Sequence, residues 1–329
     1  MSATSLDPFI EKLLRGEKRA ISRAITEVEN ETPQAEIVLR KIFHNTGRAF
    51  RIGITGPPGA GKSTLTNELA KYYRKQNLTI GILAVDPTSP FTGGALLGDR
   101  IRMQTVALDE GVFIRSMATR GSLGGLSKKA KDAADVLDAA GKDVIIFETV
   151  GVGQSELDVA QAADTTVVVL VPESGDSVQA MKAGLMEIAD VFVMNKSDRE
   201  GANQAVTALK AILQFRVTHE GNEWIPPVVK TIGSEGKGID EMVEEIANHR
   251  KYESSSGVLR TARTRQLRER IHELVNERMN IDFWTPERES LMEKSMVKVV
   301  ERTLSPYDVA EKLLETYGAS SRKKKGIKE

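Results

Sequence analysis

The sequence predicts an α/β fold in which a mostly parallel sheet is flanked by helices. Six short apolar runs have the length of strands, and they lie at residues 52–55, 79–85, 144–147, 166–171, 191–194 and 228–231. Helical stretches separate them, at 63–76, 128–140, 177–189 and 204–213. Continuous apolar runs are typical of strands buried on both faces, and strand–helix alternation favours parallel pairing. Ligands of such sheets bind at the carboxyl ends of the strands.

Helical segments precede and follow this predicted sheet. Apolar residues recur at spacings of three and four from Ile10 to Val28, and Thr32-Pro33 begins a second helix that Gly47 ends. Beyond a serine-rich linker at 253–257, the residues at 259–279 predict a long charged helix. We therefore expect an N-terminal helical extension at 1–47, a central α/β domain at 48–252, a C-terminal helical dimerisation region at 253–319 and a disordered basic tail at 320–329.

The composition is that of a soluble globular protein. Hydrophobic residues make up 40% and charged residues 28% of the 329 residues. Lys plus Arg equals Asp plus Glu at 46 each, so no overall charge draws the chain to nucleic acid or to an anionic membrane. The absence of cysteine excludes disulfides and thiolate chemistry. No uncharged apolar run approaches the ~20 residues that cross a bilayer, so we expect a cytoplasmic protein.

A glycine-rich motif lies between the first predicted strand and a predicted helix. It matches the pattern G-x-x-x-x-G-K-S, and its residues are Gly56, Pro57, Pro58, Gly59, Ala60, Gly61, Lys62 and Ser63. Glycines let backbone N–H groups curl around phosphate oxygens, and the amino end of the helix adds its dipole. We expect Lys62 to bridge the β- and γ-phosphates, Ser63 to ligate magnesium and Thr64 to reach the α-phosphate. The motif predicts a P-loop NTPase domain.

A second motif, Asn195-Lys196-Ser197-Asp198, follows the predicted strand at 191–194 and matches the pattern N-K-x-D. The Asp198 carboxylate can accept hydrogen bonds from N1 and the exocyclic N2 of guanine, which adenine cannot offer. After the next predicted strand, a short segment is placed to close over the base through backbone N–H groups; it contains Ile232, Gly233 and Ser234. The two segments predict a preference for GTP and GDP.

Carboxylates that follow predicted strands are candidate magnesium ligands. Glu148 begins Glu148-Thr149-Val150-Gly151, in the place of a D-x-x-G element whose carboxylate holds magnesium and whose glycine N–H meets the γ-phosphate. Because glutamate replaces aspartate, Glu148 either binds the ion or orients water. Gln154 is a candidate for positioning the nucleophilic water, or a solvated loop residue. Asp86 directly follows the strand at 79–85, where it would face the phosphates.

The long stretch from Asp86 to Gly111 has little periodicity, which indicates an extended loop. Asp99 in this glycine-rich loop is a candidate metal ligand and catalytic residue, in a switch that orders when γ-phosphate and metal are present. The alternative is that Asp99 caps a helix that begins near Arg100. Arg120 and Lys182 are weaker candidates for stabilising charge on the transferring phosphate, and the alternative for each is an ordinary surface position.

These motifs together resemble the MeaB/ArgK family of GTPases, and the likeness spans nearly the whole chain. It rests on the segments 56–64, 84–90, 120–125, 148–155 and 195–198. The resemblance implies a GTPase chaperone for an adenosylcobalamin-dependent acyl-CoA mutase, chiefly methylmalonyl-CoA mutase. Such a protein gates cofactor delivery and protects or rescues the mutase. It also implies a homodimer formed through the C-terminal arm. Ile232-Gly233 departs from the serine-alanine pattern of the family. We therefore expect this segment to contact the base through its backbone and not through side chains.

Two other functions stay open at this point. An older label on the same family, a kinase that serves arginine and ornithine transport, would make the protein an ATP-using enzyme, and the N-K-x-D motif argues against it. Related P-loop proteins load a metal such as nickel into an enzyme. This chain lacks a Cys/His cluster that would hold such a metal, since its four histidines have no metal-ligand spacing.

Overall fold

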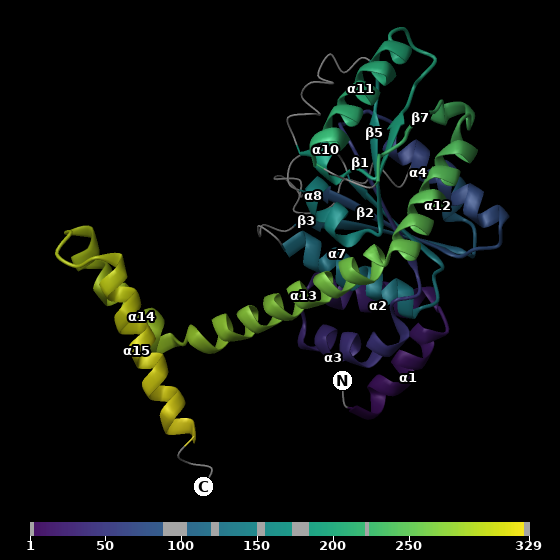
Figure 1. The fold of residues 1–329 in the computed structure, drawn as a ribbon. Helices are drawn as coiled ribbons and strands as arrows, with labels where there is room; N and C mark the ends of the chain where they lie inside the picture. Colours follow the sequence, from purple (N-terminus) through teal and green to yellow (C-terminus); the bar gives the residue numbers. More distant parts are fainter. Residues whose placement is uncertain are drawn as a thin grey trace. The chain divides into compact units, whose positions relative to one another are not determined.

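The structure, a computed structural model, describes residues 3–87, 104–119, 125–149, 155–172, 184–220 and 224–325. Contacts within the chain divide it into two compact units, Met1–Leu259 and Arg260–Glu329. The first unit holds the sheet and its covering helices, and the second is helical (Figure 1). In the described parts of the chain, no helix is long and apolar enough to cross a membrane.

The strands of the described chain form one seven-stranded sheet in the order β3-β2-β4-β1-β5-β6-β7, and all neighbours pair in parallel. The strands are β1 (Phe50–Thr55), β2 (Ile80–Pro87), β3 (Val112–Thr119), β4 (Val144–Thr149), β5 (Thr165–Leu170), β6 (Val191–Met194) and β7 (Val228–Lys230). The predicted α/β class with a mostly parallel sheet is confirmed. Because all strands run the same way, their carboxyl ends meet at one edge of the sheet.

One strand, β3, is missing from the sequence prediction. It lies at the end of the sheet, where Arg115 interrupts its apolar run. The Arg115 side chain leaves the strand to pair with Glu29 and to donate a hydrogen bond to Thr26 Oγ1 at 3.1 Å. The predicted loop from Asp86 to Gly111 is also shorter than expected, because β2 continues through Pro87 and α6 (Gln104–Ala107) lies inside the interval.

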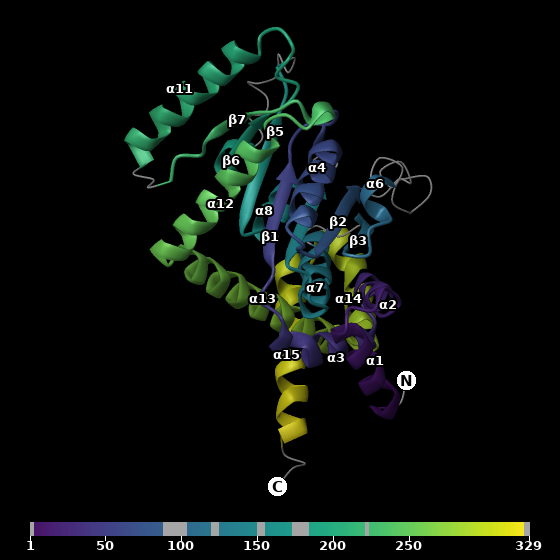
Figure 2. The ribbon, with the colours of Figure 1, turned by 90° about the vertical axis from the view of Figure 1, so that its right-hand side faces the viewer.

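Alternate residues of the strands point to opposite faces, and each face is covered by helices. On one face lie α1 (Ala3–Leu14), α2 (Lys18–Glu29), α3 (Pro33–Ile42), α7 (Gly125–Ala139) and α8 (Ser155–Ala162), with α10 (Leu185–Ile188) and α11 (Ala202–Glu220) over β5 to β7. The other face carries α4 (Lys62–Lys75), α6 and α12 (Ile239–Ser256). Figures 1 and 2 show this three-layer arrangement of the first unit. Of the predicted helix at 177–189, the described part is α10.

The predicted N-terminal extension is part of the main core. The buried residues of α2, among them Ile21 and Ile25, join one hydrophobic cluster with α7 and with strand residues such as Phe147. The short helix η1 (Phe43–Asn45) then leads into β1. Residues 3–47 therefore fold against the sheet and belong to the same compact unit as it.

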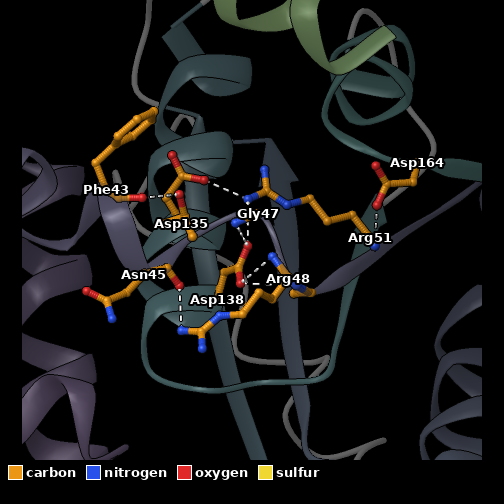
Figure 3. A network of polar contacts seen from close by, with 10 residues as sticks. Phe43, Asn45, Gly47, Arg48, Arg51, Asp135, Asp138 and Asp164 are labelled. Atoms are coloured by element: carbon orange, nitrogen blue, oxygen red, sulfur yellow. Dashed lines mark hydrogen bonds and ion pairs between the residues drawn. The ribbon is translucent and has the colours of Figure 1, made fainter. Parts of the chain in front are cut away.

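A polar network fastens the entry into β1 to α7 (Figure 3). The buried Asp138 carboxylate accepts backbone hydrogen bonds from Gly47 at 2.7 Å, Arg48 at 3.2 Å and Ala49 at 3.0 Å. The Arg51 guanidinium pairs with Asp135 at 2.6 Å and lies 3.5 Å from Asp138. A carboxylate that accepts several N–H bonds satisfies buried donors that would otherwise cost about 1–3 kcal/mol each. The network therefore fixes where β1 begins.

A histidine fastens α12 to the amino ends of β5 and β6. His249 Nδ1 lies 2.8 Å from Thr165 Oγ1, and His249 Nε2 lies 3.3 Å from Asp190 Oδ1. Trp224 packs on the imidazole, with ring centroids 5.0 Å apart, and donates its indole N–H to the Asp190 carbonyl at 2.9 Å. Burial lowers the pKa of His249 to about 4, while the negative charge of Asp164 acts in the opposite direction.

The second unit centres on a buried arginine. It contains most of α13 (Val258–Phe283), together with α14 (Pro286–Val300) and α15 (Pro306–Lys325). Arg288 is 7% exposed, and its guanidinium lies over the rings of Phe283 at 5.3 Å and Tyr317 at 5.1 Å. It also donates a hydrogen bond to Thr316 Oγ1 at 3.3 Å. These contacts hold α14 and α15 together as a hairpin.

Two boundaries differ from the prediction. The segment 253–257, predicted as a linker, continues α12 through Ser256, and its serine hydroxyls donate to carbonyls of the preceding turn, such as Ser256 Oγ to Tyr252 O at 2.7 Å. The helix ends at Gly257, which has a left-handed φ of 75°. The segment 320–329, predicted as a disordered basic tail, is helical through Lys325 as the end of α15.

We predict that His249 makes folding stability depend on pH. Because its pKa is lower in the folded protein than the ordinary 6.5, only the unfolded chain gains the proton between pH 6.5 and pH 4. The contribution of His249 to stability is therefore complete above pH 6.5 and falls as the pH drops towards 4, by up to about 3 kcal/mol. Burial raises the pKa of its neighbour Asp190 to about 7, so the contribution of that carboxyl has the opposite sign and is lost as the pH rises through 7. Urea denaturation of the wild type and of His249→Gln at several pH values measures this loss. The exposed His44→Gln is the control, and parallel pH curves for the wild type and His249→Gln would contradict the prediction.

Candidate functional site

The glycine motif forms a tight loop between β1 and the amino end of α4. Gly56, Gly59 and Gly61 have φ values of 135°, 74° and 92°, which side chains rarely allow. A Cβ atom on Gly56 would lie 2.1 Å from the Val169 carbonyl oxygen of the neighbouring strand. The loop therefore requires glycine at its first position for space as well as for conformation. Its backbone and the amino end of α4 provide the partial positive charge of an anion site.

The first residues of α4 bring a cation and a hydroxyl to this loop. Lys62 is buried, and its ammonium donates hydrogen bonds to the carbonyls of Gly56 at 2.8 Å and Pro57 at 2.9 Å. Ser63 is also buried, whereas Thr64 is exposed. Because the ammonium bonds to carbonyls of the loop itself, it lies where phosphate oxygens would accept the same hydrogen bonds.

A carboxylate from the neighbouring strand meets the Ser63 hydroxyl. Ser63 Oγ donates to Glu148 Oε1, and Glu148 is 4% exposed near the end of β4. The pairing of β1 with β4 places Ile54 opposite Glu148, and beyond it the Thr149 hydroxyl donates to Thr55 Oγ1 at 3.0 Å. A hydroxyl and a carboxylate in contact are the oxygen ligands that Mg²⁺ prefers, so this pair fits the ion.

The other predicted carboxylates are only partly placed. The backbone of Asp86 lies near the end of β2, one residue beyond Val85, which pairs with Thr149 of β4. Asp86 thus lies inside β2 rather than directly after it, and its role stays a prediction because its side chain lies outside the described residues, as does all of Asp99. Among the described side chains, no group of three or more His, Asp or Glu gathers as a metal site.

The Asn195 side chain joins three loops at the carboxyl edge. Its Nδ2 donates to the Ala60 carbonyl of the phosphate loop at 2.8 Å. Its Oδ1 accepts two hydrogen bonds, from the Thr231 hydroxyl and from the Gly233 N–H, both at 3.0 Å. A Cβ atom on Gly61 would lie 2.3 Å from this amide nitrogen, so the close approach also explains Gly61, the last glycine of the phosphate loop.

The rest of the N-K-x-D segment is fixed by similar bonds. Lys196 adopts a left-handed φ of 55° and donates from Nζ to the Gly59 carbonyl at 2.9 Å. The Ser197 N–H donates to the Thr231 carbonyl at 3.1 Å, and Asp198 is exposed at the end of the segment. The segment 195–198 is therefore held against the phosphate loop, and the Asp198 carboxylate at its end is accessible to a nucleotide bound there.

The predicted base-closing segment lies beside the segment 195–198. Ile232 is half-buried, Gly233 is buried and Ser234 is exposed at the start of η2 (Gly233–Glu235). The backbone N–H of Gly233 is already bonded to Asn195, which is a role that the sequence did not indicate. Thr231, which is 1% exposed, is the first residue of this segment directly after β7, and the hydrogen bond from its hydroxyl to Asn195 is a role that the sequence did not indicate.

Several candidates fall outside the described residues. These are Asp99, Arg120, Gly151, Gln154 and Lys182. The described part of the site consists of the phosphate loop, Lys62, Ser63, Glu148 and the two loops that Asn195 joins. It combines a phosphate cradle, a pair of oxygen ligands and a base-recognition segment at one edge of a parallel sheet.

This combination has the form of a P-loop GTPase site, since a phosphate-loop motif and an N-K-x-D motif follow separate strands that the sheet aligns. The likeness to known proteins agrees and is more specific. The chain belongs to the family described as "Methylmalonyl Co-A mutase-associated GTPase MeaB", whose sequence model matches residues 21–288. Its fold, its site and its family thus assign guanine-nucleotide binding and GTP hydrolysis to the protein.

Relatives from distant organisms align over almost the whole chain. A protein of Pyrococcus horikoshii is 49% identical over 315 residues, which cover 94% of this chain and 98% of the relative. The GTPase ArgK of Escherichia coli is 35% identical, with 93% and 95% covered. The mouse mitochondrial methylmalonic aciduria type A homolog is 34% identical, with 95% and 79% covered.

A solved structure supports the fold as well. The crystal structure titled LAO/AO transport system kinase aligns with a TM-score of 0.72 and 29% sequence identity, and covers 97% of this chain and 99% of that chain. The alignment includes the helices on both sides of the α/β core. The predicted architecture, with helices before and after a P-loop domain, is therefore confirmed.

We predict that Thr231 positions the guanine-recognition loop through Asn195. Thr231→Val removes one of two donors to Asn195 Oδ1, which leaves a buried acceptor less satisfied and costs about 1 kcal/mol. GDP affinity should fall roughly fivefold, whereas Thr231→Ser, which keeps the hydroxyl, should stay near the wild type. Titration with a fluorescent GDP analogue measures this, and xanthosine diphosphate binding by Asp198→Asn reports whether the loop is displaced. Equal GDP affinity in the valine variant would show that the hydroxyl does not position the loop.

Proposed function

We propose that the protein is a magnesium-dependent GTPase that acts as a chaperone for an adenosylcobalamin-dependent acyl-CoA mutase, with methylmalonyl-CoA mutase as the client. The observation that carries the nucleotide part is the set of hydrogen bonds by which Asn195 donates to the phosphate loop and accepts from the base-closing loop. The mutase part rests on the description of the matching family and on the name of the mouse relative.

The loop at 56–61 and the first turn of α4 bind the phosphates. The Lys62 ammonium exchanges the carbonyls of Gly56 and Pro57 for β- and γ-phosphate oxygens, which are stronger acceptors because they are charged. Thr64 is exposed at the same turn, where its hydroxyl can reach the α-phosphate. The backbone N–H groups of the loop and of Gly151 complete this cradle in the proposal.

The Ser63 hydroxyl and the Glu148 carboxylate would hold a magnesium ion, with Asp86 and Asp99 as further proposed ligands. When bound, the ion neutralises charge on the β- and γ-phosphate oxygens. Glu148 is buried beside Ser63, so it either ligates the ion or orients a water that does. In the proposal Gln154 positions the attacking water, and Asp99 moves into place when the client docks.

Guanine recognition falls to Asp198, whose exposed carboxylate accepts from N1 and N2 of the base. Asn195 and Lys196 hold this segment against the phosphate loop. The segment of Ile232, Gly233 and Ser234 would line the other side of the base; the N–H groups of Ile232 and Gly233 are bonded to Lys237 O and Asn195 Oδ1, which leaves the Ser234 N–H as the donor of this segment to the base. Because a carboxylate selects guanine, the loop favours GTP over ATP, and we do not propose an ATP-using transport kinase. No described side-chain cluster supports the proposal of a metal-inserting enzyme.

We expect the client to stimulate hydrolysis. Adding purified methylmalonyl-CoA mutase from the same organism should raise the GTP turnover rate at saturating magnesium at least tenfold. Lys62→Ala should abolish turnover in both conditions, because the charge at the phosphates is lost while the fold is kept. Phosphate release and circular dichroism measure the two properties. If the mutase forms no complex in the presence of GTP, a GTP analogue or GDP, the chaperone function is wrong even where GTP hydrolysis is intact.

We also propose that the chain forms a homodimer through the second unit. Several large apolar side chains of α13 and α14 are half or more exposed, such as Ile271 at 62%, Val297 at 63% and Val300 at 75%. Such a density of exposed apolar surface marks an interface, and a second copy offers the same surface in return. The charges in this region are interspersed, so the apolar stripe is the principal source of affinity.

The dimer can be tested in the full-length chain. Ile271→Asp should convert a species of twice the 36.0 kDa chain mass into a monomer, because a charge would be buried in the interface. The neighbouring exposed His272→Asp is the matched control and should stay dimeric. Sedimentation velocity separates the two masses. A dimer that survives Ile271→Asp would place the interface elsewhere.

A further inference from the structure

A groove lies between α4 and α12, away from the phosphate loop. Its volume is about 560 Å³, and its floor is formed by residues that are 8% exposed or less: Phe50, Tyr73, Val144 and Val243. Phe50 and Val144 are the first residues of β1 and β4, so the floor lies at the amino edge of the sheet. Figure 2 shows α4 and α12 beside one another along β1. The groove is thus an apolar recess at the edge opposite to the nucleotide.

The rim on the α12 side carries negative charge. Asp240 and Glu244 lie one turn apart, line the groove and are exposed. Neither carboxylate forms an ion pair or a hydrogen bond within the described part of the chain. The Arg250 guanidinium stacks over the Phe50 ring at 4.5 Å, and so the positive charge of the rim is held at one end of the groove. Two carboxylates therefore face any molecule that enters beside them.

These features define the chemistry of an occupant. The floor is mainly apolar, with the Tyr73 ring beside Phe50, Val144 and Val243, and it favours burial of a large aliphatic or aromatic side chain rather than of a polar metabolite. Two carboxylates spaced by one helical turn favour a cation beside that side chain. We propose that the groove is a docking site for a helix of a partner protein that presents a large apolar residue and an arginine or lysine one turn away.

The walls of this docking groove connect it to the nucleotide. Helix α4 begins with Lys62 and Ser63 of the phosphate site, and α12 begins after Gly238, which ends the base-closing loop. An occupant of the groove packs against the last turn of α4 and against α12 from Asp240 onward, so it contacts the two helices that begin at the phosphate loop and at the base-closing loop. Docking in the groove is therefore coupled to nucleotide affinity, and the coupling is reciprocal. That the partner is the client mutase rests on the proposed function.

A peptide experiment tests the groove without the client. The probe is a fluorescein-labelled alanine-based helix with leucine and arginine four residues apart, and its counterpart carries glutamate in place of arginine. Fluorescence anisotropy with the full-length protein should give at least tenfold tighter binding of the arginine peptide. Glu244→Lys should remove that preference, whereas Glu241→Lys, an exposed position of α12 outside the groove, should keep it. Equal binding of both peptides, or equal effects of the two variants, would overturn the proposal.

Two tryptophan variants, one that fills the groove and one beside it, test whether the groove binds the peptide and the mutase. Ala247→Trp fills the groove, and the neighbouring exposed Asn248→Trp, which does not line it, is the control. Ala247→Trp should weaken the arginine peptide and the purified mutase at least tenfold, with basal GTP hydrolysis unchanged. Equal mutase affinity in both variants would overturn the mutase as the occupant, and loss of the dimer in Ala247→Trp would assign the groove to a second copy instead. If the wild type binds the peptide but not the mutase, the proposed function fails and the groove stands.

Discussion

The nucleotide site depends on one buried amide, that of Asn195. A carboxamide has a donor end and an acceptor end, and both are used here: the donor holds the phosphate loop at Ala60, and the acceptor holds Thr231 and Gly233. A carboxylate could not donate, and an apolar side chain would leave three buried groups unsatisfied. The phosphate loop follows β1, Asn195 follows β6, and the closing loop follows β7. The amide therefore turns three separate strand ends into one surface.

The strand order determines what else reaches this surface. Because β1 lies between β4 and β5, the phosphate loop is bordered by Glu148 on one side and by Val169 on the other. The first neighbour supplies an oxygen ligand, and the second leaves room for glycine alone. The hydrophobic packing of both faces keeps the strands in register, and α4, one of the covering helices, also supplies Lys62 and Ser63 to the site itself.

Local patterns were sufficient for much of this fold and site. The phosphate loop and the Asn195–Asp198 segment are contiguous, so their meaning can be derived from spacing and from the strand that precedes each. The edge strand β3 was not predicted because Arg115 interrupts its apolar run, and edge strands tolerate such residues. The helices at 10–28 showed a buried face, but periodicity does not reveal what that face covers. Thr231 and His249 act through partners more than thirty residues away, which a local pattern cannot indicate.

The arrangement of the aromatic residues has a spectroscopic consequence. The chain contains two tryptophans, and each compact unit holds one: Trp224 packs on His249 in the first, and Trp284 meets the Phe283 ring edge-on in the second. An indole in contact with an imidazole changes its emission when that imidazole gains a proton. Each unit thus carries its own intrinsic optical reporter, and a single replacement of either tryptophan separates the two signals.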